Sequence, residues 1–304
     1  MQLFNKLPSI KEGYLLVDHS LGAGETLDEA RYLLFSPHDA SGEGNELGLN
    51  RVPSEVKRHL THEATLLEEY FNQERDVGMN ELGTEILKRC PGGVRVSAEL
   101  NRGLCNASGV ATGPFALPEI WSPEGLRAAR PLLEKIHRSM IGDLDVIFAG
   151  LKPGARIICL HSMDPWGFEQ GTRPPLSHAS MKEYVAAQGW SVQKKIPRKE
   201  DFISGQEEDR LNADLELYQA LQKLFDKNEI PWAINEPYGP DQSCTDFQYM
   251  QMYPGRVSTI YLTKSSLCVG DIKTFDPRNP KVDPHKVAFM AELHSQVING
   301  IIRL

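Results

Sequence analysis

The chain has 304 residues, with 41 acidic and 33 basic side chains and a formal net charge of −8. It contains no long lysine- and arginine-rich block of the kind that follows a phosphate backbone. The closest cluster, at 194–199, is short, contains a proline and is followed by an acidic stretch. We therefore expect no nucleic-acid partner. The length allows one large α/β domain or two smaller ones, and a single domain over 1–304 is the simpler expectation.

The cysteines are odd in number and widely spaced, and none forms a CxxC pair. This pattern indicates neither a disulfide framework nor a thiolate zinc site. The N-terminal residues lack the apolar core of a signal peptide, and no apolar run approaches the ~20 residues needed to cross a bilayer. These features predict a cytoplasmic protein with no membrane partner. The five cysteines are Cys90, Cys105, Cys159, Cys244 and Cys268.

Predicted strands and helices alternate along the chain. Short apolar runs rich in β-branched residues predict strands, and apolar residues repeating at about 3.6 predict helices. The expected strands lie at 13–18, 31–35, 94–100, 155–160, 232–235 and 257–262. Helices are expected from Pro53, over 62–90 with a break near Gly78, from Ser122 to Phe148, over 207–228 and over 284–304.

This alternation predicts a three-layer α/β fold, with a mostly parallel mixed sheet and helices on both faces. Between 163 and 204 the composition becomes loop-like, with several glycines and prolines. Loops of this kind often cover a binding site, so we expect a flap here.

Two of the predicted strands end at a histidine. The buried run at 155–160 stops at His161, and the run at 31–35 leads through Ser36 and Pro37 to His38. In α/β sheets, ligands bind in the crevice beyond the carboxyl ends of the strands. The two imidazoles are therefore candidates for one shared site, although a lone histidine at a strand end often only makes a hydrogen bond.

A third predicted strand, at 94–100, ends at Asn101 and Arg102. A guanidinium can bind both oxygens of a carboxylate, and a neighbouring amide can add a further hydrogen bond. The pair is therefore a candidate substrate-binding element. A surface ion pair is the alternative reading for the arginine.

The order of these short motifs resembles the N-formylglutamate amidohydrolase family, which is related in fold to the zinc carboxypeptidases. The matching residues are Ser36-Pro-His38, His62-Glu63, Glu99-Leu-Asn-Arg102, Leu160-His-Ser-Met163 and Asn235-Glu-Pro-Tyr238. The resemblance implies a phosphorylase/hydrolase-like fold. It also implies a zinc-dependent hydrolase that cleaves a carbon–nitrogen amide bond in a small N-acyl, N-formyl-like amino acid.

The resemblance also implies roles for individual residues. His38 and His161 match the two histidine metal ligands. Glu63 is the expected third ligand, with Glu43 and His62 as alternatives. Asn101 and Arg102 match the pair that holds the substrate carboxylate.

The sequence departs from the family pattern at the late strand, where Thr263 stands at the position expected for a glutamate. Threonine cannot act as a carboxylate base, so the general base stays unassigned, with Glu236 as one candidate. Two alternatives to an amidohydrolase therefore stay open. One is an inactive relative that binds a small carboxylate or a protein partner, and the other is a carboxypeptidase-like peptidase.

Overall fold

The computed structural model describes somewhat more than half of the chain. The described residues are 14–23, 25–38, 53–60, 67, 70–72, 75–102, 104–105, 107, 123–162, 166–167, 196–197, 200–203, 214–234, 260–265, 276 and 279–302.

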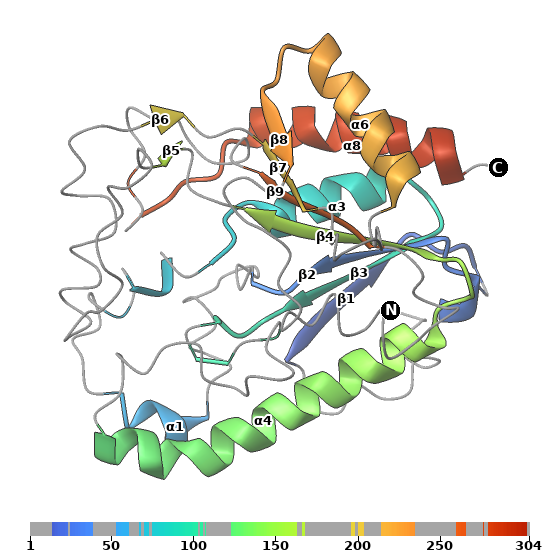
Figure 1. Cartoon of the computed structure of the whole chain (residues 1–304). Coiled ribbons are helices and arrows are strands. Elements are labelled where there is room, and N and C mark those ends of the chain that lie inside the picture. Colours follow the sequence, from blue (N-terminus) through green and yellow to red (C-terminus); the bar gives the residue numbers. More distant parts are fainter. Residues whose placement is uncertain are drawn as a thin grey trace, which may run out of the picture.

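A seven-stranded mixed sheet forms the centre of the molecule, in the order β1-β3-β2-β4-β9-β7-β8 (Figure 1). The four strands β3, β2, β4 and β9 run parallel to one another, β1 and β7 are antiparallel to their neighbours β3 and β9, and β8 runs parallel to β7. A separate pair consists of β5 (Trp166–Gly167) and β6 (Ile196–Pro197). The sheet strands are β1 (Leu15–His19), β2 (Tyr32–Ser36), β3 (Gly93–Ala98), β4 (Arg156–Ser162), β7 (Glu200–Ile203), β8 (Trp232–Ile234) and β9 (Ile260–Ser265).

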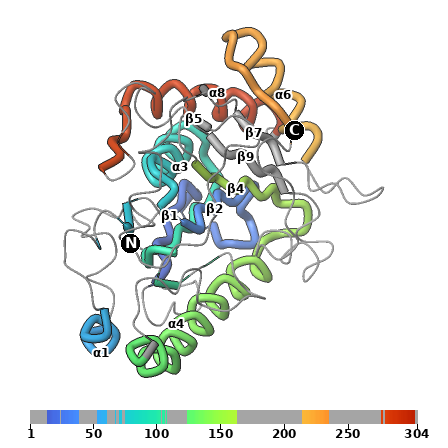
Figure 2. Tube along the Cα trace, turned by 60° about the vertical axis from the view of Figure 1, so that its left-hand side comes forward, coloured from blue at the N-terminus to red at the C-terminus, as the bar shows by residue number. Residues whose placement is uncertain are grey.

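Helices cover both faces of this sheet. Figures 1 and 2 show α3 (Met79–Arg89), α6 (Leu215–Lys227) and α8 (Pro284–Ile302) together on one face. The long helix α4 (Pro123–Gly150) lies on the opposite face, beside the short α1 (Ser54–Lys57). A 3-10 turn, η2 (Leu27–Glu29), connects β1 to β2. The molecule is therefore built in three layers, as the sequence predicts.

The central strands β2 and β4 are buried on both sides, which explains their nearly continuous apolar sequences. Successive side chains of a strand point to opposite faces. Leu33 and Phe35 of β2 accordingly pack into the core under α4, while Tyr32 and Leu34 pack into the core under α3, α6 and α8. In β4, Ile157 and Cys159 join the first core, and Ile158 and Leu160 join the second.

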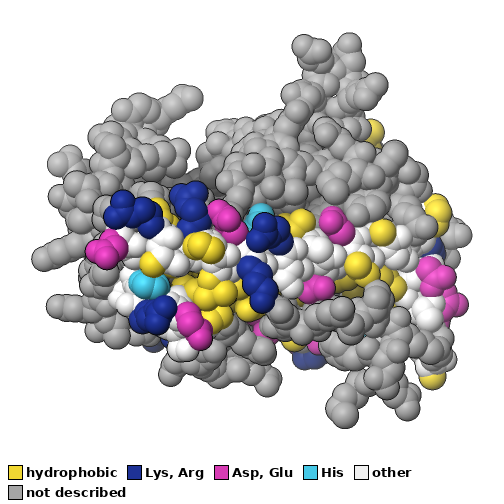
Figure 3. All heavy atoms as spheres, turned by 90° about the horizontal axis from the view of Figure 1, so that it is seen from below, with side chains coloured by type: hydrophobic (Ala, Val, Ile, Leu, Met, Phe, Trp, Pro, Cys, Tyr) yellow, Lys and Arg dark blue, Asp and Glu magenta, His cyan; other side chains and the backbone are white. Residues whose placement is uncertain are grey.

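The face that carries α4 shows charged side chains of both signs, with hydrophobic side chains between them (Figure 3). Among the apolar side chains of α4, Val146 is exposed, while Leu133, Ile136 and Met140 are buried in the core under this helix. The helix is therefore amphipathic, as expected for one covering layer of a sheet. None of the helices among the described residues is long and apolar enough to cross a membrane.

The α/β fold class and most predicted elements are confirmed, and several boundaries differ. The helix predicted from 207 begins at Leu215, because the Asp214 side chain accepts a hydrogen bond from the Leu217 amide and caps it. The break predicted near Gly78 within the helical stretch 62–90 is observed over 75–78, before α3 starts at Met79. Residues 200–203, at the end of the predicted flap, form β7 of the main sheet. Most of 163–199 lies outside the described residues, so the flap stays a prediction.

Candidate functional site

The two histidines chosen from the sequence come together at the carboxyl end of the central sheet. Strands β2 and β4 are parallel neighbours, with Phe35 in register with Cys159. His161 is the penultimate residue of β4, and His38 lies two residues after the end of β2. Their ring centroids are 5.1 Å apart. Neighbouring parallel strands end at the same edge, so the sheet itself brings the two imidazoles together.

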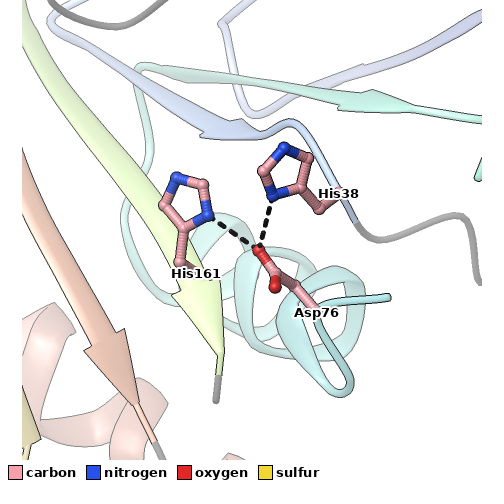
Figure 4. Close-up of side chains that lie close together, drawn as sticks. All are labelled: His38, Asp76 and His161. Atoms are coloured by element: carbon pink, nitrogen blue, oxygen red, sulfur yellow. Dashed lines mark hydrogen bonds and ion pairs between the residues drawn. The ribbon is translucent and has the colours of Figure 1, made fainter. Parts of the chain in front are cut away.

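A carboxylate that the sequence analysis did not single out lies between them. Asp76 Oδ2 is 2.7 Å from His161 Nδ1 and 3.4 Å from His38 Nδ1 (Figure 4). The Asp76 backbone amide also donates a hydrogen bond of 3.0 Å to the His38 carbonyl. Asp76 therefore binds the loop that carries His38 through both its side chain and its main chain.

The three side chains are almost completely buried, with 8% of His38, 6% of Asp76 and 5% of His161 exposed. Burial alone would raise the pKa of Asp76, but the adjacent His161 and His38 hold that pKa well below its usual value. Burial lowers the pKa of His38, against the opposing influence of Asp76. Asp76 is therefore ionised and can only accept hydrogen bonds, so a ring nitrogen that bonds to it carries the proton.

These residues fit a transition-metal site by the chemistry of their donor atoms. One possible ligand atom from each of the three lies within 4.8 Å of the others. Catalytic zinc usually has three protein ligands of imidazole and carboxylate type at about 2.0–2.2 Å and keeps a fourth position for water. A shared cation would require these ligand atoms to move closer together and to lose the protons between the rings and the carboxylate.

Arg102, half-buried in the turn after β3, is close enough for its charge to contribute to the lowered pKa of His38. Its neighbour Asn101 is fully buried, and Asn101 Nδ2 donates a 2.8 Å hydrogen bond to the Phe71 carbonyl. The Asn101 carbonyl accepts hydrogen bonds from the amides of Leu104 and Cys105. Asn101 thus fixes the turn that presents Arg102 near the imidazoles, and the substrate-binding role of both residues stays a prediction.

The other candidate ligands cannot be placed. Glu63, Glu43 and His62 lie outside the described residues, as does Glu236. Asp76 was missed because it lies where a helical pattern was expected to continue. The useful signal was the predicted break near Gly78, where an acidic residue precedes a glycine with φ of 87° at the start of α3.

Backbone pairing also bears on the position where the family pattern has a glutamate. In β9, Thr263 is in register with Leu160, whereas Lys264 is in register with His161. Neither position holds an acid. The described part of the chain therefore offers no carboxylate on β9 beside the candidate site.

No protein-family model matches the sequence, and no curated protein matches it either. Among solved structures, the fold is similar to that of N-formylglutamate amidohydrolase from Ralstonia eutropha JMP134, with a TM-score of 0.52, 13% identity, and 95% of this chain and 97% of that chain covered. The structure of a gene product from Agrobacterium tumefaciens has a TM-score of 0.48 and 11% identity. The likeness covers 95% of this chain and 96% of that chain. Carboxypeptidase A from Helicoverpa armigera has a TM-score of 0.39 and 9% identity. Here the likeness covers 97% of this chain and 69% of that chain. The chain thus has the fold of an N-formylglutamate amidohydrolase over almost its whole length.

Proposed function

We propose that the protein is a metal-dependent amidohydrolase that cleaves the amide bond of a small N-acyl amino acid, with zinc bound by His38, Asp76 and His161. The observation that carries this proposal is the buried cluster of two imidazoles and one carboxylate at the carboxyl ends of β2 and β4. The fold shared with an amidohydrolase supports the reaction class, although a fold alone does not determine an activity. Asp76 replaces Glu63 here as the proposed third ligand.

Each residue has a distinct part in this proposal. His38 and His161 provide neutral nitrogen donors, and Asp76 provides one negative charge, so a bound divalent cation keeps net positive charge. Zinc with such ligands polarises a carbonyl group and activates water for attack at neutral pH. The surrounding burial keeps these groups away from bulk solvent, which strengthens their electrostatic interactions.

Arg102 is the proposed anchor for the carboxylate of the substrate. Its charge acts on His38, so an anion bound to the guanidinium would lie beside the reacting centre. Guanidinium binds a carboxylate through two parallel hydrogen bonds, which also fixes the orientation of the ligand. Asn101 supports this anchor through its hydrogen bond to Phe71. The residue that transfers protons during the reaction is not assigned.

Metal content tests the foundation of the proposal. The purified protein should contain close to one equivalent of zinc by elemental analysis, and His38→Ala, Asp76→Ala and His161→Ala should each lose most of it. His285→Ala is the matched control, because His285 is exposed near the start of α8 and belongs to no such cluster among the described residues. Wild-type metal content in all three site variants would contradict the proposal.

The register of β9 favours one second candidate, a non-catalytic relative that binds a small carboxylate or a protein partner. The β9 positions beside Leu160 and His161 hold Thr263 and Lys264, and neither side chain can act as a carboxylate base. Amine release from N-formyl, N-acetyl and peptidyl derivatives of acidic amino acids separates the candidates. Turnover of the acyl amino acids supports the amidohydrolase, and turnover of peptides alone supports a peptidase. Ligand-induced thermal stabilisation without any turnover supports the non-catalytic relative.

A further inference from the structure

We infer that Arg95, which touches none of the three candidate ligands, is a positioning residue that holds Asp76 in place between His38 and His161 by fixing the first turn of α3. This inference rests on the proposed role of Asp76 as a metal ligand. It concerns a buried charge on β3 that the proposed reaction itself does not use.

Arg95 is placed on the α3 side of the sheet by strand alternation. Its neighbours Val94 and Val96 pack into the core under α4, so the Arg95 side chain emerges on the opposite face. Only 3% of Arg95 is exposed. A buried guanidinium requires polar partners, because an unpaired charge in the interior is strongly unfavourable.

Two of these partners belong to α3. Arg95 Nη1 donates hydrogen bonds of 2.6 Å to the Asn80 carbonyl and 2.6 Å to Thr84 Oγ1. Thr84 Oγ1 in turn donates to the same Asn80 carbonyl at 2.7 Å. The third partner is Asp18 on β1, which forms an ion pair with Arg95 Nη2. One side chain of β3 therefore connects the first two turns of α3 to the edge of the sheet.

The packing of α3 on the arginine is close. A Cβ atom at Gly83 would lie 2.8 Å from Arg95 Cδ, so the helix lies directly on the arginine stem at a position where a side chain would require the arginine to shift. The axial position of α3 on the sheet is thus fixed by the hydrogen bonds of Arg95, and its distance from the sheet by the contact with Gly83.

Asp76 follows the position of this helix because it lies immediately before it. The Asp76 carbonyl accepts a 3.4 Å hydrogen bond from the Met79 amide, and the Gly78 carbonyl accepts one of 2.9 Å from Leu82. A shift of the first turn of α3 would therefore move the Asp76 carboxylate relative to the imidazoles on β4 and after β2. Partners outside the ligand shell commonly change metal affinity about 10- to 100-fold when they are removed.

The test uses the full chain and two independent measurements. In metal-free protein, the Nδ1 proton of His161 that is bound to Asp76 should give a strongly downfield NMR signal, assigned by its absence in His161→Gln. Arg95→Met keeps the packing of the stem on Gly83 and removes the hydrogen bonds, so it should lose or markedly shift this signal and weaken zinc binding about tenfold or more. Arg95→Lys, which keeps a buried cation and donor, should restore part of both.

Arg89→Met is the matched control. Arg89 lies at the other end of α3 and pairs with Glu85 and Glu292, so its loss should leave the His161 signal and the zinc affinity at wild-type values. If Arg95→Met does not fold, Thr84→Val replaces it and should weaken zinc binding through loss of one Arg95 contact. The inference would be overturned if the folded Arg95→Met variant kept the wild-type His161 signal and zinc affinity. The same result in Thr84→Val would overturn it where that variant replaces Arg95→Met. Absence of the signal from the wild-type protein would also overturn it. Absence of zinc binding by the wild-type protein would instead overturn the proposed function, and the NMR signal would still decide the role of Arg95.

Discussion

The Asp76 carboxylate sets the charge of the candidate site. It lies within hydrogen-bonding distance of His161 and close to His38, in surroundings that exclude most solvent. Since both imidazoles hold the pKa of Asp76 well below its usual value, the carboxylate is charged at neutral pH. The site is therefore ready to accept a cation without first ionising this ligand.

The pH dependence of stability should separate the contributions of these groups in metal-free protein. Burial lowers the pKa of His38 below its ordinary value of 6.5, so the unfolded chain binds a proton more readily than the folded one. Stability should be fully present above about pH 6.5 and should fall as the pH is lowered, by at most about 1.4 kcal/mol per pH unit for this group. Asp76, whose pKa is also lowered, contributes only below about pH 4.

Urea unfolding in the presence of a chelator at pH 5, 6, 7 and 8 measures this effect. His38→Gln should show a shallower loss of stability between pH 6.5 and 5 than the wild-type protein. His294 is also buried with a lowered pKa, but it is common to both proteins and cancels from the comparison. Equal slopes in the two proteins would show that His38 does not titrate in this range.

Of the three residues of the candidate site, the sequence predicted His38 and His161, which lie at or just after the ends of strands. It did not predict Asp76, which precedes a helix. His38 and His161 each follow a buried apolar run, and a parallel sheet brings such positions together whatever the loops do. Asp76 has no comparable signature, because acidic residues before helices are common and usually cap them. Only the packing of α3 on β3 shows that this one points at the histidines.

Among the elements, the junction of α3 and β3 is closely packed. A Cβ atom at Gly93 would overlap the ring of Tyr32, whose hydroxyl donates a hydrogen bond of 2.5 Å to the Cys90 carbonyl. The Tyr32 ring is fully buried and so has no free space to move into. The start of β3 therefore accepts only glycine without displacement of the Tyr32 ring.

Two glycine-to-alanine variants should have opposite effects. Gly93→Ala should destabilise the protein by more than about 3 kcal/mol or prevent folding, because the overlap requires movement of a buried ring. Gly142→Ala, inside α4, should stabilise it by about 0.5–1 kcal/mol, because no atom of the described residues, apart from the backbone of the same helix, lies within 4 Å of the new methyl group. Urea unfolding of both variants measures the difference, and equal stabilities would contradict this account of Gly93.

The elements that the sequence predicted well are those whose own residues determine them. The apolar runs of β2 and β4, and the start signal at Pro123 of α4, are local features. By contrast, β7 at 200–203 pairs with β9 and β8, which are formed by residues later in the chain. Its strand conformation depends on these distant partners, so the local composition predicted a loop.

The whole molecule consists of two separate apolar cores that share one sheet. One core lies under α4 and the other under α3, α6 and α8, and the candidate site lies at the carboxyl ends of the central strands β2 and β4. Each of its three side chains comes from a different segment, namely the end of β2, the loop before α3 and the end of β4 (Figure 4). A cation bound there would connect these segments in the folded state only.

Zinc should therefore raise the unfolding temperature of the wild-type protein. A ligand that binds only the folded state at 100 times its dissociation constant adds about 2.7 kcal/mol to the free energy of unfolding. Calorimetry with and without added zinc measures the shift, with Asp76→Ala as the comparison that should show little or none. An equal shift in both proteins would place the zinc elsewhere.

The distribution of these side chains along the chain has a consequence during synthesis on the ribosome. His38 and Asp76 leave the exit tunnel well before His161, and the strand β9 that pairs with the far side of β4 follows much later. Contacts between such distant segments form late, because the intervening chain must first be ordered. A nascent polypeptide therefore cannot bring the three side chains together before His161 has left the tunnel, so any metal bound by them should be acquired late in synthesis or after it.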